Sequence, residues 1–249
     1  MNKGILIQAR TGSTRLPGKM LKEFYGGKTL IEIIIERLIS FNTGLPIILA
    51  TTVNSKDTPL AEIAAKNGIK VYRGEEENVL SRFSKTTREY SLDAIIRVCA
   101  DNPFIDKSFM NSVLENSGNS DYCSFFKDSS TPVIRTHYGF FTEYVTANAL
   151  TEVLKADPDK FHLEHVTNYI YGHEKLFKIK KLDLPAYFLT LPSVRLTIDT
   201  AEDFDVCKVI YAYFCDKGQE MTAANVLEFL KERKDLVATM QEQILKNGK

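Results

Sequence analysis

Short apolar runs alternate with amphipathic segments along the first half of the chain. The runs have strand length, and the segments between them carry apolar residues at helical spacing. The predicted strands cover residues 5–8, 46–50, 69–72 and 94–100, and the predicted helices cover residues 29–41, 57–67 and 77–90. Strands that alternate with helices in this way predict βαβ units and an α/β fold with a mostly parallel sheet.

The alternation weakens in the second half of the chain. Residues 127–148 are rich in Ser, Thr and aromatic side chains, and 137–144 resemble a strand. We expect this part to be an irregular excursion or hairpin outside the main sheet, with a substrate or partner region at about 127–165. The remaining predicted helices are 106–116, 148–155, 162–171, 202–214 and 222–246, and the remaining strands are 121–126, 176–182 and 193–198. Without repeats or a long linker, residues 1–249 are predicted to form one domain.

The first strand leads into the loop ARTGSTRLPGK, residues 9–19. Small residues leave its backbone N–H groups accessible, and Arg10, Arg15 and Lys19 add positive charge, which together suit a polyphosphate. The loop is not a Walker A motif. The segment from Gly12 to Gly18 is one residue too long, and Met20 stands where that motif has a hydroxyl.

In a parallel sheet, ligands bind at the carboxyl ends of the strands. Four segments follow predicted strands: the loop after the first strand, Thr51-Thr52, Arg73-Gly74 and Asp101. The topology therefore predicts that these four segments lie along one edge of the sheet.

Composition restricts the partners. The 249 residues are 44% hydrophobic and 26% charged, and 32 Lys and Arg balance 32 Asp and Glu, so no overall field favours nucleic acid or a membrane surface. We see neither a membrane-length apolar stretch nor a secretory leader, and therefore expect a cytoplasmic protein. The four cysteines are widely spaced, and we assign them no chemical role.

Two carboxylates follow predicted strands, Asp101 and Asp199. Carboxylates at strand ends can hold Mg²⁺ against a phosphate, usually with several waters. Alone, either residue is equally well explained as a helix cap or turn residue. Two of them can share one ion only if the fold brings them together.

His162 and His165 lie three positions apart on a predicted helix, with Glu164 between them. They lack the spacing of H-E-x-x-H, so a structural role is favoured over a metal site, although they can also position an anionic or hydroxylated substrate. The chain has no G-x-S-x-G turn, which argues against a nucleophilic hydrolase.

The loop motif is similar to A-R-x-x-S-T-R-L-P-G-K of the sugar-acid cytidylyltransferases. Further blocks resemble the spore coat polysaccharide biosynthesis protein F branch of that superfamily. These blocks are Arg73-Gly74, VLSR at 79–82, DNPFID at 101–106, EHVT at 164–167 and LTIDTAED at 196–203. They occur in the family's order and span nearly the whole chain.

The resemblance implies a Rossmann-like, three-layer nucleotidyltransferase that uses CTP and Mg²⁺, often as a homodimer. It implies metal binding by Asp101 and Asp199. It implies nucleotide binding by Ala9, Arg10, Gly12, Ser13, Arg15, Lys19, Ala50, Thr51 and Arg73, with Arg82 as a further binder. The acceptor candidates are Arg135, His162 and His165. Asn102 stands where the cytidylyltransferases that activate 3-deoxy-manno-octulosonate have an acidic residue. The resemblance therefore does not imply that this chain uses their substrate.

The predicted reaction is transfer of CMP from CTP to a sugar acid or related acceptor, with release of pyrophosphate, in surface polysaccharide biosynthesis. Lys19, Arg10, Arg15 and Asp101 are the predicted catalytic residues. The alternatives are a nucleotide-sugar-dependent glycosyltransferase or binding protein, and a non-catalytic assembly protein that uses the aromatic residues near 130–145. Retention of Asp101 and Asp199 argues against the assembly protein.

Overall fold

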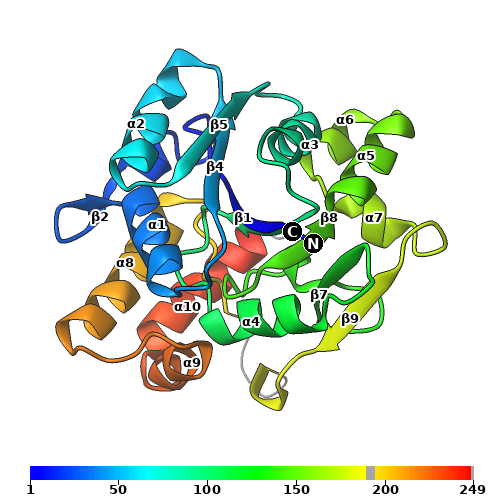
Figure 1. Ribbon diagram of the computed structural model, residues 1–249. Helices are drawn as coiled ribbons and strands as arrows, with labels where there is room; N and C mark the ends of the chain where they lie inside the picture. The colour runs from blue at the N-terminus through cyan, green and yellow to red at the C-terminus, as the bar shows by residue number, and fades with distance from the viewer. Residues whose placement is uncertain (189–193, 248–249) are drawn as a thin grey trace.

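A computed structural model describes residues 1–188 and 194–247 of the chain (Figure 1). The strands are β1 (Lys3–Gln8), β2 (Glu23–Tyr25), β3 (Lys28–Thr29), β4 (Ile47–Thr52), β5 (Lys70–Gly74), β6 (Ala94–Cys99), β7 (Tyr122–Phe126), β8 (Glu143–Thr146) and β9 (Ile179–Asp183). The α-helices are α1 (Leu30–Ser40), α2 (Thr58–Lys66), α3 (Val79–Glu89), α4 (Lys107–Asn116), α5 (Ala147–Lys155), α6 (Lys160–Glu164), α7 (Asn168–Gly172), α8 (Ala201–Asp216), α9 (Ala223–Glu232) and α10 (Lys234–Lys246). Short 3₁₀ turns are η1 (Lys19–Leu21), η2 (Ser55–Asp57), η3 (Val133–Arg135) and η4 (Ala186–Phe188).

Seven strands form the central sheet in the order β5-β4-β1-β6-β8-β7-β9. The first four are mutually parallel, β8 is antiparallel to both of its neighbours, and β9 is parallel to β7. Gln8 at the end of β1 lies opposite Ala50 of β4 and Cys99 of β6. The carboxyl ends of the four parallel strands therefore share one edge, which confirms the predicted mostly parallel sheet.

The two faces of the sheet carry separate cores. On β1, Ile5 and Ile7 pack with residues of α1, α4 and α8, whereas Leu6 packs with residues of α3 and α5. Successive side chains of a strand point to opposite faces, so one buried strand supplies both cores. Helices cover both faces (Figure 1), and the predicted three-layer α/β arrangement is confirmed.

Part of the predicted excursion belongs to the central sheet. Residues 127–142 are irregular apart from η3, but β8 lies between β6 and β7, with Ile96 opposite Tyr144. The expectation that residues 137–144 stay outside the sheet is therefore wrong for the β8 residues. In the sequence, β8 follows β7. In the sheet, β8 lies between β6 and β7, so β7 is not a neighbour of β6.

Three other predicted elements differ. Residues 194–198 form no strand: Leu196 N–H donates to His137 and Ile198 N–H to Asp101, two isolated bonds rather than a ladder. Ser193 of that prediction lies outside the described residues. The helix predicted over 222–246 breaks at Arg233, and the one over 162–171 breaks after Glu164.

None of the helices within the described ranges combines the length and apolar character needed to cross a bilayer.

Candidate active site

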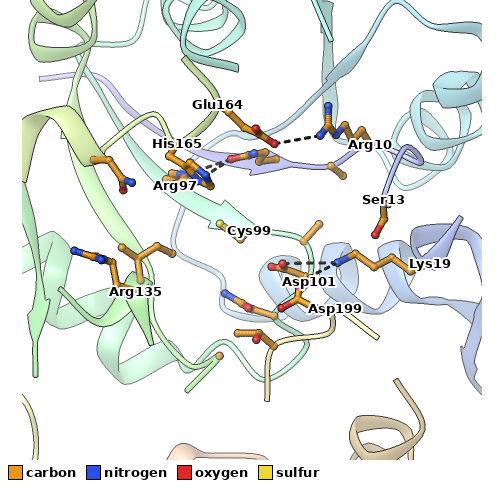
Figure 2. Close-up of a pocket in the computed structure, with 18 of the residues that line it drawn as sticks. Arg10, Ser13, Lys19, Arg97, Cys99, Asp101, Arg135, Glu164, His165 and Asp199 are labelled. Carbon is orange, nitrogen blue, oxygen red and sulfur yellow. Dashed lines mark hydrogen bonds and ion pairs between the residues drawn. The ribbon is translucent and has the colours of Figure 1, made fainter. Parts of the chain in front are cut away.

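A cavity of about 780 Å³ opens at the carboxyl edge of the parallel strands. The loop after β1, the end of β6, the 133–141 segment and the α6–α7 region line it. Figure 2 shows Arg10, Ser13 and Lys19 on one side of this cavity and Arg135 on the other, with Cys99 between them. One edge of the sheet thus brings together segments from most of the chain.

The loop after β1 is anchored by a buried carboxylate. Asp57 Oδ1 accepts bonds from Thr11 N at 2.7 Å and Thr11 Oγ1 at 2.6 Å, while its Oδ2 accepts from Thr52 Oγ1. Gly18 then turns the chain with φ of 69°, a left-handed conformation that glycine adopts without a Cβ penalty. Lys19 follows as the first residue of η1 and points into the cavity.

Lys19 lies between the two predicted metal ligands. Its Nζ is 3.8 Å from Asp101 Oδ2 and 3.9 Å from Asp199 Oδ1, and it donates to the carbonyl oxygen of Ile198. Arg15 also reaches Asp199 Oδ1, at 3.0 Å. Figure 2 shows Lys19 beside Asp101 and Asp199. Lys19 and Arg15, two cations of the loop, therefore share one end of the cavity with the two carboxylates.

A second positive region lies beside Arg10. Arg82 of α3 lines the cavity, is 1% exposed, and its Nε finds no hydrogen-bond partner among the described residues. Burial, followed by the charge of Arg10, lowers the pKa of Arg82 to about 10. Arg10 itself pairs with Glu164 at 3.3 Å, and both side chains are partly exposed. Such a pair is worth little, so an anionic ligand can displace Glu164 and relieve the repulsion between the two arginines.

Arg97 and Gln8, which line the cavity, belong to a buried charged network. Arg97 NH1 lies 2.7 Å from Glu143 Oε2 and donates to Thr167 Oγ1, while its NH2 donates to Gln8. Tyr122 donates its hydroxyl to Glu143. Burial, together with the charge of Glu143, raises the pKa of Tyr122 well above its usual value, so this hydroxyl keeps its proton. The network ties β6, β8 and the turn before α7 together.

The side of the cavity opposite the loop carries polar and apolar groups. Arg135 of η3, His165, Asn168 and Tyr171 line it together with Ile134. No hydrogen bond or ion pair of the Arg135 side chain is found among the described residues. His162, by contrast, lies outside the cavity lining, and its Nδ1 is 2.7 Å from Asp159 Oδ1. Of the predicted acceptor residues, the structure brings Arg135 and His165 to the cavity.

The predicted nucleotide residues separate into two groups. Ala9, Arg10, Gly12, Ser13, Arg15 and Lys19 line the cavity. Ala50 and Thr51 are completely buried within β4 and do not reach it. Arg73 also lies outside, because it donates to the carbonyl oxygens of Thr52 and Asn54, at 2.9 Å each, and to Thr58 Oγ1 at 3.2 Å. Arg73 therefore holds the connection after β4 in place.

Several site residues escaped the sequence interpretation. Asp57, Arg97, Glu143 and Arg195 are buried and charged, and each acts through bonds to distant segments. Charged residues are rarely buried without a partner. The position of Arg97 inside an apolar strand run was therefore the one sequence signal that indicated a buried charge with a partner. Nothing in the local sequence identifies Glu143 as its partner.

Comparisons with known proteins agree with this geometry. A profile described as cytidylyltransferase matches residues 4–249. The chain is 33% identical to the spore coat polysaccharide biosynthesis protein SpsF of Bacillus subtilis over 95% of this chain and 97% of that protein. It is 36% identical to an uncharacterised protein of Methanocaldococcus jannaschii over 84% of this chain and 83% of that one.

A solved structure of a cytidylyltransferase from Leptospira borgpetersenii superposes with a TM-score of 0.78 at 27% identity, covering 95% of this chain and 97% of the other. The family profile and this fold cover the cationic loop as well as both carboxylates. The chain is therefore a member of the cytidylyltransferase family, near its spore coat polysaccharide branch.

Proposed function

We propose that this protein transfers CMP from CTP to a sugar acid or related acceptor in the synthesis of a surface polysaccharide, and releases pyrophosphate. The observation that carries the proposal is the meeting of the loop's Lys19 with Asp101 and Asp199 at one end of a cavity whose other end holds Arg135 and His165. Family membership and the likeness to SpsF support the nucleotide and the pathway.

In the reaction, the oxygen of an acceptor hydroxyl forms a bond to the α-phosphorus, the bond from phosphorus to the pyrophosphate oxygen breaks, and the hydroxyl proton is released to water. Arg10, Arg15 and Lys19 bind the triphosphate and stabilise the charge that develops on the leaving pyrophosphate. The backbone N–H groups of Gly12 and Thr14 add donors, whereas the Ser13 N–H already donates to the carbonyl oxygen of Thr11. The enzyme acts by positioning and electrostatic stabilisation, without a covalent intermediate.

The residues present fit a magnesium ion. Asp101 and Asp199 are hard oxygen ligands on one side of the cavity, and the neighbouring Asn102 Oδ1 is buried without a hydrogen-bond partner in the described residues. Mg²⁺ in phosphoryl transfer uses one or two carboxylates together with substrate and water oxygens. When bound, the ion would neutralise phosphate charge and lower the pKa of the acceptor hydroxyl. Lys19 and Arg15 would then turn from the carboxylates toward phosphate oxygens.

The chemistry of the opposite wall supports the proposed acceptor. Arg135 offers a guanidinium that suits a carboxylate, while Asn168, Tyr171 and His165 suit hydroxyl groups. The Ile134 side chain adds apolar surface. This combination supports an acceptor that is both anionic and hydroxylated.

A pyrophosphate-release assay tests the proposal. The purified protein is incubated with each of the four nucleoside triphosphates, Mg²⁺ and a panel of sugar acids, with the corresponding neutral sugars as matched controls. We expect release with CTP and an acidic acceptor only, and loss of release on addition of EDTA. Tight binding of a nucleotide sugar without any pyrophosphate release overturns the proposal in favour of a glycosyltransferase or binding protein.

We also propose that the protein is a homodimer, as the family resemblance implies, and that it acts in the cytoplasm. Size-exclusion chromatography with light scattering tests the dimer, and fractionation of cells that express a tagged chain tests the location. A monomeric mass at micromolar concentration, or recovery outside the cytoplasmic fraction, contradicts the respective proposal.

A further inference from the structure

Arg195 is a buried arginine behind Asp199. Its side chain is 0% exposed and does not line the cavity. Its Nε and NH2 bind the two carboxylate oxygens of Asp203 at 2.7 and 2.9 Å, and NH2 also donates to Asp199 Oδ2 at 3.0 Å. We propose that the Arg195–Asp203 pair is a positioning device that leaves Asp199 only one oxygen, Oδ1, to offer to a metal ion.

The backbone at Asp199 is held by the same group. Asp203 Oδ2 accepts from the N–H groups of Asp199 and Thr200, each at 3.0 Å, in the capping box that begins α8. Both the main chain and the side chain of Asp199 are therefore tied to one buried ion pair. Rotation of its carboxylate would break the bond to Arg195 inside the protein, where lost charge-assisted bonds are costly.

Arg195 is itself fixed from behind. Its NH1 lies 2.9 Å from His137 Nδ1 and donates to the carbonyl oxygen of Asn247 at 3.2 Å. Because Nε, NH1 and NH2 are all engaged, the guanidinium cannot turn toward the cavity to bind substrate. It acts on the reaction only through Asp199.

Restricting Asp199 to one free oxygen affects which metal ion the site prefers. Asp199 Oδ1 already faces the cavity, where Arg15 reaches it at 3.0 Å. A carboxylate restricted to one oxygen suits Mg²⁺ or Mn²⁺, which take single oxygens in octahedral geometry, whereas Ca²⁺ readily takes both oxygens of one carboxylate. Arg195 thus makes the site selective against Ca²⁺. This inference rests on the proposed function, because it requires a metal at Asp199.

Binding of Mn²⁺ provides a test that does not depend on turnover. Electron paramagnetic resonance measures free Mn²⁺ in the presence of the protein and a non-hydrolysable CTP analogue, and Mg²⁺ or Ca²⁺ is then added as competitor. In Arg195→Lys one ammonium group cannot hold both Asp199 and Asp203. We expect Mn²⁺ affinity to fall about 10-fold, as for other residues that orient metal ligands, and Ca²⁺ to gain about 10-fold on Mg²⁺ as competitor.

Three further variants make the result decisive. Asp203→Asn keeps the size of the side chain and loosens Arg195 without removing it. It should therefore lower the Mn²⁺ affinity and favour Ca²⁺ over Mg²⁺ as competitor, in the same direction as Arg195→Lys. It keeps the test valid if Arg195→Lys does not fold. Arg37→Lys is the control, since Arg37 is a partly buried arginine bonded to the carbonyls of Ile105 and Met221 and outside the cavity lining. It should leave both quantities unchanged. Asp199→Asn removes the negative charge of the ligand itself.

The outcomes separate the two proposals. In one outcome, Asp199→Asn weakens Mn²⁺ binding, but Arg195→Lys and Asp203→Asn keep the Mn²⁺ affinity and the relative strength of Ca²⁺ and Mg²⁺ as competitors within twofold of wild type. That outcome overturns the positioning role and leaves the metal site standing. If Asp199→Asn has no effect on Mn²⁺ binding, the proposed metal site fails, and the role of Arg195 fails with it.

Discussion

The N–H group of Ile198 donates a hydrogen bond to the carbonyl oxygen of Asp101 at 2.9 Å. This bond joins the turn after β6 to the segment before α8, two parts of the chain that are far apart in sequence. It places Asp199 beside Asp101 and lets Lys19 approach both carboxylates. Lys19 also donates to the carbonyl of the same Ile198, so the bond organises both the acidic and the cationic parts of the site.

Replacing Lys19 with Met tests its role in the reaction. Lys19→Met removes the charge that faces the leaving pyrophosphate while keeping the length of the side chain. We expect turnover to fall by about 10²-fold or more, as when one transition-state contact is lost. The measurement is steady-state pyrophosphate release. Lys22→Met, at the exposed residue that follows η1, is the control and should keep nearly full turnover; a comparable loss in both variants would contradict the assignment.

Two arginines on the nucleotide side of the sheet should behave differently. Arg73→Lys loses bonds to backbone oxygens and should destabilise the fold by about 1–2 kcal/mol, with KM for CTP within twofold of wild type. Arg82→Lys should raise KM for CTP about tenfold, since Arg82 lines the cavity and a lost charge-assisted bond has about that effect. Urea unfolding and CTP kinetics measure both. An equal rise in KM for Arg73→Lys is the result that would place Arg73 in the site.

The buried pair of Arg97 and Glu143 should matter for stability. Glu143→Gln leaves Arg97 as a buried charge without its partner, which costs about 3–5 kcal/mol. It also releases Thr167, so KM for the acceptor should rise more than KM for CTP. Urea unfolding gives the free energy. Glu152→Gln breaks an exposed ion pair with Lys155 and should cost less than about 1 kcal/mol; similar losses in the two variants would argue against the network.

Gly139 approaches the backbone of Leu196 closely. Its φ is 71°, and a Cβ there would lie 2.6 Å from the carbonyl oxygen of Leu196. Gly44 has φ of 72° with nothing within 4 Å of a Cβ, so Gly44→Ala incurs only the left-handed strain of about 1–2 kcal/mol. Gly139→Ala should lose clearly more unfolding free energy, because Leu196 precedes the turn that carries Asp199 and must shift. Equal losses of unfolding free energy in Gly139→Ala and Gly44→Ala would show that the close contact between Gly139 and Leu196 does not matter for stability.

Local pattern accounts for much of the fold. The predicted strand 94–100 and helix 29–41 match β6 and α1 within one or two residues, because periodicity records which faces are buried. The rim of the sheet was also predictable, since parallel strands end on the same side. The loop that contains Lys19 was found because phosphate binding needs cations, glycines and free N–H groups in a short stretch.

Contacts between distant segments account for the rest. The insertion of β8 beside β6, the burial of Arg97 against Glu143, and the use of Arg73 for backbone bonds all depend on partners elsewhere in the chain. The sequence alone identified Asp101 and Asp199 as candidate metal ligands. Only the tertiary structure decided that they meet at Lys19, because the Ile198–Asp101 hydrogen bond that brings them together forms between segments whose local patterns carry no record of each other.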